Sequence, residues 1–243
     1  MSLQDLTILP VKDEPYIQRG GKELSEMLPK PPALLLCISP VKTGKSTILS
    51  NLLLRDSMFN GYFTGGIHFI SPTINLDKTS RFIRDHPDIQ THDEYSDDLI
   101  NAITDFQLER DDDLPVAVIL DDILGLIDHR STATKLASRF RHYNIDLLAF
   151  SVQKYKGAIP PTIRMNATDV IIGSPFPNQS ELEMLSNDFG DLYGGKDAFL
   201  ELYKKACPKR HDFLYLKLGE NPAEAYAGFG EKLFPIGESK DND

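Results

Sequence analysis

The chain has 243 residues, of which 41% are hydrophobic and 26% charged, and its mean hydropathy is -0.27. This length and composition are typical of one large α/β domain with additions, and they exclude a disordered chain. The apolar runs are too short to cross a bilayer, and the net charge of -10 argues against binding of nucleic acid over the whole surface.

Residues 1–32 are punctuated by prolines and glycines and predict an irregular N-terminal arm ahead of the core. Short apolar runs typical of strands buried on both faces follow at residues 33–38, 67–70, 116–120, 145–152 and 170–172. Segments with helical spacing lie at residues 47–54, 95–106 and 132–140. Residues 177–206 predict one or two more helices, and residues 213–218 a last strand. This alternation predicts an α/β fold with a mostly parallel sheet.

The segment after the first predicted strand reads SPVKTGKS, residues 39–46, and we call it the phosphate loop. It nearly matches GxxxxGK[ST] between a strand and a helix, with Ser39 in place of the first glycine and Pro40 after it. In this motif backbone N–H groups wrap the phosphates, Lys45 reaches the β and γ oxygens, and Ser46 ligates Mg²⁺. The alternative is an ordinary turn before a helix. The residues expected to bind the nucleotide are Ser39, Val41, Lys42, Thr43, Gly44, Lys45, Ser46 and Thr47.

Two carboxylates follow the apolar run at 116–120. Beside a phosphate loop, such a strand end supplies a carboxylate for Mg²⁺, here Asp121, and a group that orients or deprotonates the attacking water, here Asp122. The alternative is a strand that ends in aspartates before a turn. Together with Lys45, the pair predicts hydrolysis of a nucleoside triphosphate.

The predicted strand at 145–152 ends in Gln153, at the sheet edge where ligands of open α/β sheets bind, and a glutamine there can sense the γ-phosphate. Lys154, Tyr155 and Lys156 follow in what the sequence predicts to be an exposed loop. Two cations and an aromatic ring suit contact with a DNA backbone. The alternatives are a chance polar residue at the strand end and a solvated loop whose lysines balance the acidic surface.

Four stretches of the sequence resemble the poxvirus-type genome-packaging ATPases of large DNA viruses and virophages, which belong to the FtsK–HerA superfamily. They read LLLCISPVKTGKST, AVILDD, RFRHYNIDLLAFSVQKYKGAIPPTIRMNATDVIIG and PNQSELEML. The resemblance covers residues 33–218, and its specific part is the long third stretch, because phosphate loops are common to many families.

This resemblance implies a three-layer, RecA-like P-loop NTPase of the additional-strand type, with an ATPase domain at 33–218 between the N-terminal arm and a C-terminal extension at 219–243 that ends in an acidic tail. It also implies a homo-oligomeric ring that hydrolyses ATP with Mg²⁺ and moves double-stranded DNA into a preformed capsid. Capsid or portal-vertex proteins are then partners, and an arginine finger lies at Arg139 or Arg141, with Arg164 as a further candidate.

The sequence start carries no secretory signal, and the two cysteines form no zinc or redox motif, so we expect a cytosol-like compartment. The resemblance places this in the host cytoplasm, in a virus factory, or with the virion. Two other functions stay open from the sequence: a small-molecule or nucleoside kinase, and a non-hydrolysing interaction protein with a degenerate phosphate loop.

Overall fold

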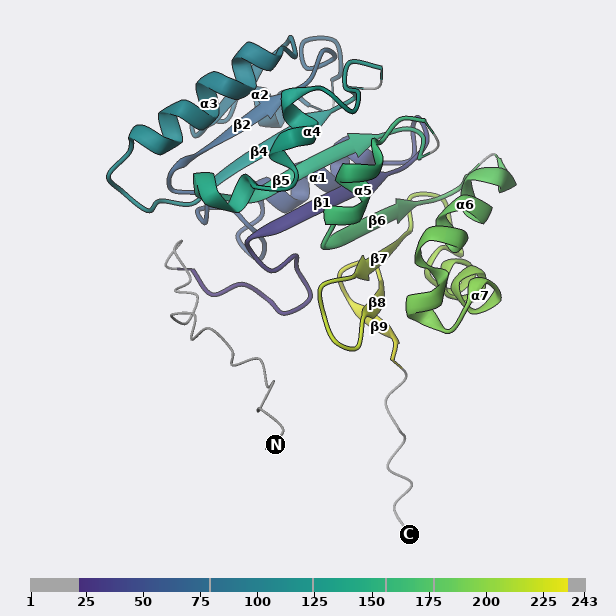
Figure 1. Cartoon of the computed structure of the whole chain (residues 1–243). Coiled ribbons are helices and arrows are strands. Elements are labelled where there is room, and N and C mark those ends of the chain that lie inside the picture. The colour runs from purple at the N-terminus through teal and green to yellow at the C-terminus, as the bar shows by residue number, and fades with distance from the viewer. Residues whose placement is uncertain (1–21, 79, 124, 156, 177, 236–243) are drawn as a thin grey trace, which may run out of the picture.

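The computed structural model describes residues 22–235 except for 79, 124, 156 and 177. Nine strands of this part form one sheet in the order β3-β2-β4-β5-β1-β6-β7-β8-β9 (Figure 1). Their bounds are β1 Ala33–Ile38, β2 Gly66–Ile70, β3 Ile89–His92, β4 Val116–Asp121, β5 Ile145–Val152, β6 Asp169–Gly173, β7 Phe213–Lys217, β8 Glu224–Ala227 and β9 Glu231–Phe234.

The sheet is parallel from β3 to β6 and antiparallel from β6 to β9. Strand β5 lies between β1, which precedes the phosphate loop, and β4, which carries the two aspartates. This inserted strand is the feature that the additional-strand expectation requires. The predicted fold class, a mostly parallel central sheet flanked by helices, is confirmed.

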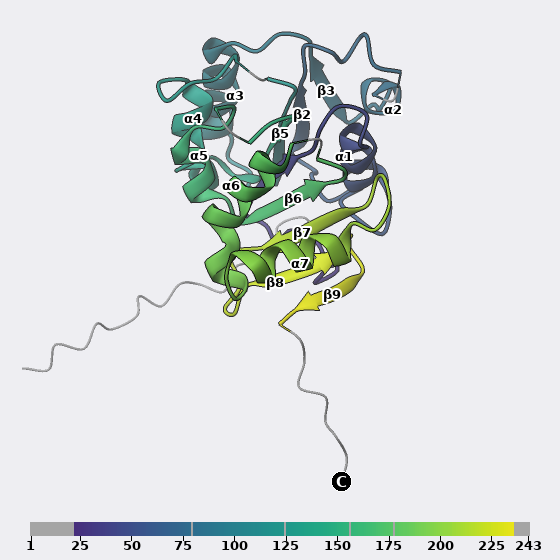
Figure 2. The same cartoon turned by 90° about the vertical axis from the view of Figure 1, so that its right-hand side faces the viewer.

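Helices cover both faces of the sheet. Figure 2 shows α1 and α2 on one side and α3, α4, α5 and α6 on the other. The helices are α1 Lys45–Leu54, α2 Arg81–Arg84, α3 Asp97–Glu109, α4 Thr132–Leu136, α5 Pro161–Asn166, α6 Gln179–Phe189 and α7 Lys196–Ala206, with 3₁₀ turns at Phe140–Tyr143 and Gly190–Tyr193. Side chains of β1 alternate between the two faces, as strand geometry requires. Leu34 and Leu36 pack in the core under α3 to α7, while Leu35 and Cys37 pack in the core under α1.

Several expected elements differ from the structure. The helix expected at 132–140 ends at Leu136, and Phe140 begins a separate 3₁₀ turn. The exposed loop predicted from Lys154 onward does not extend to the next helix: Ala158, Ile159 and Pro160 are buried, and α5 begins at Pro161. Strands β8 and β9 continue the sheet beyond residue 218, the expected end of the ATPase domain, and the proposed division of the chain stays a prediction.

Among the residues described, no helix combines the length and the apolar character that a membrane crossing needs.

Candidate functional site

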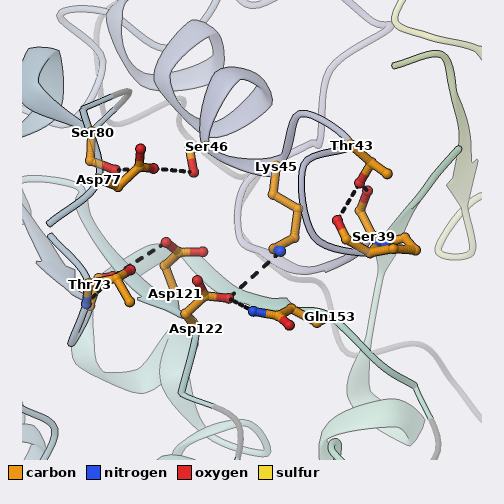
Figure 3. Close-up of polar contacts among 12 residues, drawn as sticks. Ser39, Thr43, Lys45, Ser46, Thr73, Asp77, Ser80, Asp121, Asp122 and Gln153 are labelled. Carbon is orange, nitrogen blue, oxygen red and sulfur yellow. Dashed lines mark hydrogen bonds and ion pairs between the residues drawn. The ribbon is translucent and has the colours of Figure 1, made fainter. Parts of the chain in front are cut away.

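The strand order brings the sequence-predicted residues to one edge of the sheet. Strands β4, β5 and β1 are adjacent and parallel, with Ile38 paired to Val152 and Asp121 paired to Ser151. Their carboxyl ends therefore meet, and segments that follow the three strands face one another. Figure 3 shows Lys45 and Ser46 opposite Asp121, Asp122 and Gln153 across a common space.

The phosphate loop ends in a helix N-terminus that no side chain caps. Gly44 has φ 105°, in the left-handed region that favours glycine, and α1 begins at Lys45 with no side chain capping its first N–H groups. Unpaired N–H groups and the positive end of the helix dipole attract an anion. The loop thus has the backbone of a phosphate site even though its first glycine is replaced.

Ser39, which replaces that glycine, is fully buried below the loop. Its hydroxyl forms a hydrogen bond with Thr43 Oγ1, and Thr43 Oγ1 donates to the Pro40 carbonyl at 2.5 Å. The Ser39 side chain fits because residue 173 is glycine: a Cβ at Gly173 would lie 2.0 Å from Ser39 Oγ. Ser39 and Thr43 therefore brace the loop from below.

Lys45, Asp122 and Gln153 form one connected cluster (Figure 3). Lys45 Nζ lies 3.7 Å from Asp122 Oδ1, and Gln153 Nε2 donates to the same oxygen at 3.1 Å. Asp122 has φ 52°, a conformation that aspartate tolerates better than most residues, and its N–H donates to the Ser151 carbonyl at 3.0 Å. The turn after β4 is thereby held so that the carboxylate faces both the lysine and the glutamine.

Asp121 is a buried carboxylate with one oxygen left without a partner. Its Oδ2 accepts from Ser71 Oγ at 3.4 Å, whereas Oδ1 has no hydrogen-bond partner among the residues described. Burial raises the pKa of Asp121 from its ordinary 3.8 to about 6. An unpaired buried oxygen costs free energy that a bound cation would recover.

The Ser46 hydroxyl donates to Asp77 Oδ2 at 3.0 Å, and Ser80 Oγ donates to the same oxygen at 3.1 Å. Asp77 is a site residue that the sequence analysis missed. It lies in the segment after β2, which is parallel to β4 and ends at the same sheet edge. That topology is the signal that could have found it. Because the Ser46 hydroxyl donates its hydrogen bond to Asp77, the lone pairs of its oxygen remain available to a cation.

A pocket of about 410 Å³ joins Lys45, Ser46, Asp77, Asp122 and Gln153, whereas Asp121 is buried and does not line it. It is lined by Pro40, Val41, Lys42, Gly44, Lys45, Ser46, Thr47, Thr73, Leu76, Asp77, Asp122 and Gln153. A larger cavity of about 810 Å³ lies elsewhere, between residues 24–31 and the antiparallel strands, and none of the predicted site residues lines it. Size alone does not locate the site, since the phosphate loop and the residues that follow β4 and β5 line the smaller pocket.

Magnesium fits the donors at this site. Among the residues that the structure describes, no three histidine, cysteine or acidic side chains gather to form a complete metal cage. Mg²⁺ does not need one, because it is usually held by one or two carboxylates together with phosphate oxygens and water. The unpaired Asp121 Oδ1 and the Ser46 hydroxyl are oxygen ligands of this kind.

The structure does not bring Arg139 and Arg141 to this pocket. Both precede β5, whose eight residues separate its two ends by roughly 25 Å. Arg141 instead lines a cavity with Lys30, Asp169 and Lys217 at the opposite edge of the sheet. Neither arginine therefore reaches a phosphate bound at this loop of the same chain.

The turn after Gln153 differs from the expected exposed loop. Tyr155 is only 1% exposed, so the expectation of an exposed aromatic ring is wrong. Its hydroxyl donates to Asp188 at 2.5 Å, its N–H donates to Glu181 at 2.9 Å, and the Arg164 guanidinium lies 5.2 Å from its ring centre. Lys154 is exposed, while Lys156 lies outside the described residues.

No protein-family model matches the sequence, and comparison with curated proteins by sequence finds no match either. Among solved structures, the chain is similar to B204, the DNA-packaging ATPase of Sulfolobus turreted icosahedral virus, with a TM-score of 0.56 and 14% identity over 81% of this chain and 97% of that chain. The chain has the fold of a P-loop NTPase.

The genome-packaging NTPase B204 of Sulfolobus turreted icosahedral virus 2 has the same fold. In its complex with sulfate, it matches with a TM-score of 0.54 and 13% identity over 79% of this chain and 95% of that chain. In its complex with AMP, it matches with a TM-score of 0.51 and 15% identity over 76% of this chain and 92% of that chain. The expected resemblance to packaging ATPases is thus confirmed at the level of the fold.

Proposed function

We propose that the chain is an ATP-hydrolysing DNA translocase that packages viral double-stranded DNA into a preformed capsid. The observation that carries the proposal is the cluster of Lys45, Asp122 and Gln153 beside the unpaired Asp121 oxygen, at the end of a phosphate loop. The similarity in fold to B204, which is named a DNA-packaging ATPase, supports the packaging role.

In this proposal the backbone N–H groups before α1 and the Lys45 ammonium hold the β- and γ-phosphates. Ser46 and Asp121 hold Mg²⁺, which neutralises charge on the phosphates. Asp122 accepts a proton from the attacking water, and Gln153 orients that water or the γ-phosphate. Lys45 and Gln153 already contact Asp122, so positioning and charge stabilisation come from groups that are in place before the reaction.

The remaining parts of the proposal concern partners. Arg139 or Arg141 acts on the nucleotide of a neighbour, which requires a ring of identical subunits. Lys154, exposed and directly after Gln153, contacts the DNA backbone; the same role for Lys156 is carried over from the sequence. Capsid or portal-vertex proteins are the partners that receive the DNA, in the host cytoplasm or at the virion.

The two competing functions are less well supported. A kinase needs an acceptor pocket and arginines that close over it, but no arginine lines the described part of the 410 Å³ pocket. A non-hydrolysing protein gains nothing from keeping a buried carboxylate with one unpaired oxygen near Lys45, because burial destabilises its charged form.

Release of inorganic phosphate from ATP, with and without double-stranded DNA, tests the proposal. A translocase releases phosphate, and DNA stimulates it. Release that depends on an added small-molecule acceptor would indicate a kinase, and no release would indicate an interaction protein. In DNA binding, Lys154→Ala should lower the slope of log K against log salt by about 0.9 per lost phosphate contact in each bound subunit. Lys204→Ala, on the exposed face of α7, is the matched control.

A further inference from the structure

Arg210 and His211 lie beside the phosphate loop although they are more than 160 residues away in sequence. Arg210 Nη2 donates to the Lys42 carbonyl at 3.2 Å, across 168 positions of the chain. The His211 imidazole lies next to Gly44, where a Cβ would be 3.5 Å from His211 Nδ1. Figure 3 shows the yellow-green ribbon of the C-terminal part of the chain passing beside the loop that carries Thr43.

The backbone of this turn is held in place. His211 has φ 75°, in the left-handed region, and its N–H donates to the Ser174 carbonyl at 3.3 Å. The Lys209 N–H donates to Asp212 Oδ2 at 2.8 Å. A left-handed conformation is strained for a residue other than glycine, and such residues cluster at functional sites. Both side chains are nevertheless exposed to solvent, so packing in the core does not explain their position.

The direction of a bound nucleotide follows from the strand order. Asp122 and Gln153, after β4 and β5, mark the end of the phosphate loop where the γ-phosphate lies in the proposed function. A nucleoside triphosphate is a linear molecule, so its nucleoside leaves the loop on the other side of β1, above β6 and β7. The turn of Arg210 and His211 enters β7, whose first residue, Phe213, pairs with Gly173 at that edge.

We propose that Arg210 and His211 form the nucleoside-binding part of the site and contact the base and ribose of a nucleoside triphosphate. A guanidinium stacks on aromatic rings and donates hydrogen bonds. The hydrogen bond to the Lys42 carbonyl holds the Arg210 guanidinium beside the phosphate loop. The imidazole of His211 offers a flat face and two nitrogen atoms for a base. This inference rests on the proposed function, because it takes the phosphate loop to bind a nucleotide.

Calorimetric binding of two ligands separates the nucleoside from the phosphates. Mg·ATP carries both parts, whereas Mg·tripolyphosphate carries the phosphates alone. The variants are Arg210→Ala and His211→Gly, the latter because glycine adopts φ 75° without strain. The matched controls are Arg84→Ala and His129→Ala, two exposed residues outside the pocket. Thermal unfolding of each variant checks that the fold is kept.

We expect each of the two variants to weaken Mg·ATP binding about tenfold, as loss of one stacked or hydrogen-bonded contact does, and to leave Mg·tripolyphosphate binding within about twofold. Equal losses for both ligands would overturn the assignment and make the turn a phosphate contact. Unchanged binding of both would show that the turn only braces the loop. If the unaltered protein binds neither ligand, the proposed function fails as well. Equal losses or unchanged binding in the variants overturn only the role of the turn, so the two failures are distinguishable.

Discussion

The two ends of β5 differ in what surrounds them. At its carboxyl end, Gln153 contacts Asp122, which in turn contacts Lys45, so three groups from three segments are already connected. At its amino end, Arg139 and Arg141 lie on or beside a 3₁₀ turn, with exposed side chains and no group of the 410 Å³ pocket near them.

The comparison shows that one strand separates a site assembled within the subunit from two arginines that do not reach it. Burial and hydrogen bonds fix the first set, so substitutions there act within one chain. The second set has no acceptor of its own at the phosphate loop, so substitutions there should act on a neighbour. The predictions below test this difference.

The largest effect is expected at the carboxyl end. Lys45→Ala should reduce ATP hydrolysis to background, because the ammonium stabilises charge on the phosphates. The protein should stay folded, because the ammonium does not contribute to core packing. A phosphate-release assay measures it, with Lys204→Ala as the control. Turnover close to that of the unaltered protein would show that this loop is not the hydrolytic site.

At the amino end, Arg141→Ala should lower hydrolysis by about 10³-fold if Arg141 is the arginine finger. Mixing this variant with a second inactive variant should then restore part of the activity. Subunits with Lys45→Ala and subunits with Arg141→Ala, each inactive alone, should regain part of the activity when they assemble together. Arg139→Ala is tested in the same way. Mixed assemblies that stay inactive would place the finger elsewhere, at Arg164 or within the same subunit.

The smallest effect concerns Asp121, whose pKa of about 6 lies above its ordinary 3.8. A carboxyl whose pKa is raised on folding favours the folded state below pH 4, and this contribution is lost as the pH rises through 6. Asp121→Asn should therefore raise the free energy of unfolding by about 3 kcal/mol at pH 8 and by about half of that at pH 5.

The same substitution should abolish the Mg²⁺-dependent part of ATP binding, because it removes the charged ligand. Denaturant unfolding at the two pH values and ATP binding across a Mg²⁺ series measure the two effects. Asp111→Asn, in an exposed loop, is the control and should change neither. Reduced stability of Asp121→Asn at pH 8 would contradict the account of this carboxylate.

The sequence predicts the central strands well because strands buried on both faces are made almost entirely of apolar residues. The runs at 33–38 and 145–152 coincide with β1 and β5. Strand β3, Ile89–His92, escaped prediction because it lies at the sheet edge and three of its four residues are polar. Strands β8 and β9 are short antiparallel strands at the other end of the sheet and have no such run.

For the site, a local motif predicts only what lies within it. The phosphate loop, Asp121, Asp122 and Gln153 could be assigned from strand ends, because each follows an apolar run. Asp77 could not, since its contact with Ser46 spans 31 positions. Tyr155 was placed in solvent for the same reason: the acceptor of its hydroxyl, Asp188, is 33 positions away.

Ser39 and Gly173 share one volume, since the hydroxymethyl group of Ser39 lies where a side chain at 173 would be. The two positions are therefore expected to covary among homologues: a chain with glycine at the start of the loop has room for alanine on β6, and a chain with serine there does not. In the laboratory, Gly173→Ala alone is expected to unfold the loop, while Ser39→Gly in the same molecule restores it. The residue at position 173, on the neighbouring strand β6, thus determines which residues the first position of the phosphate loop can hold.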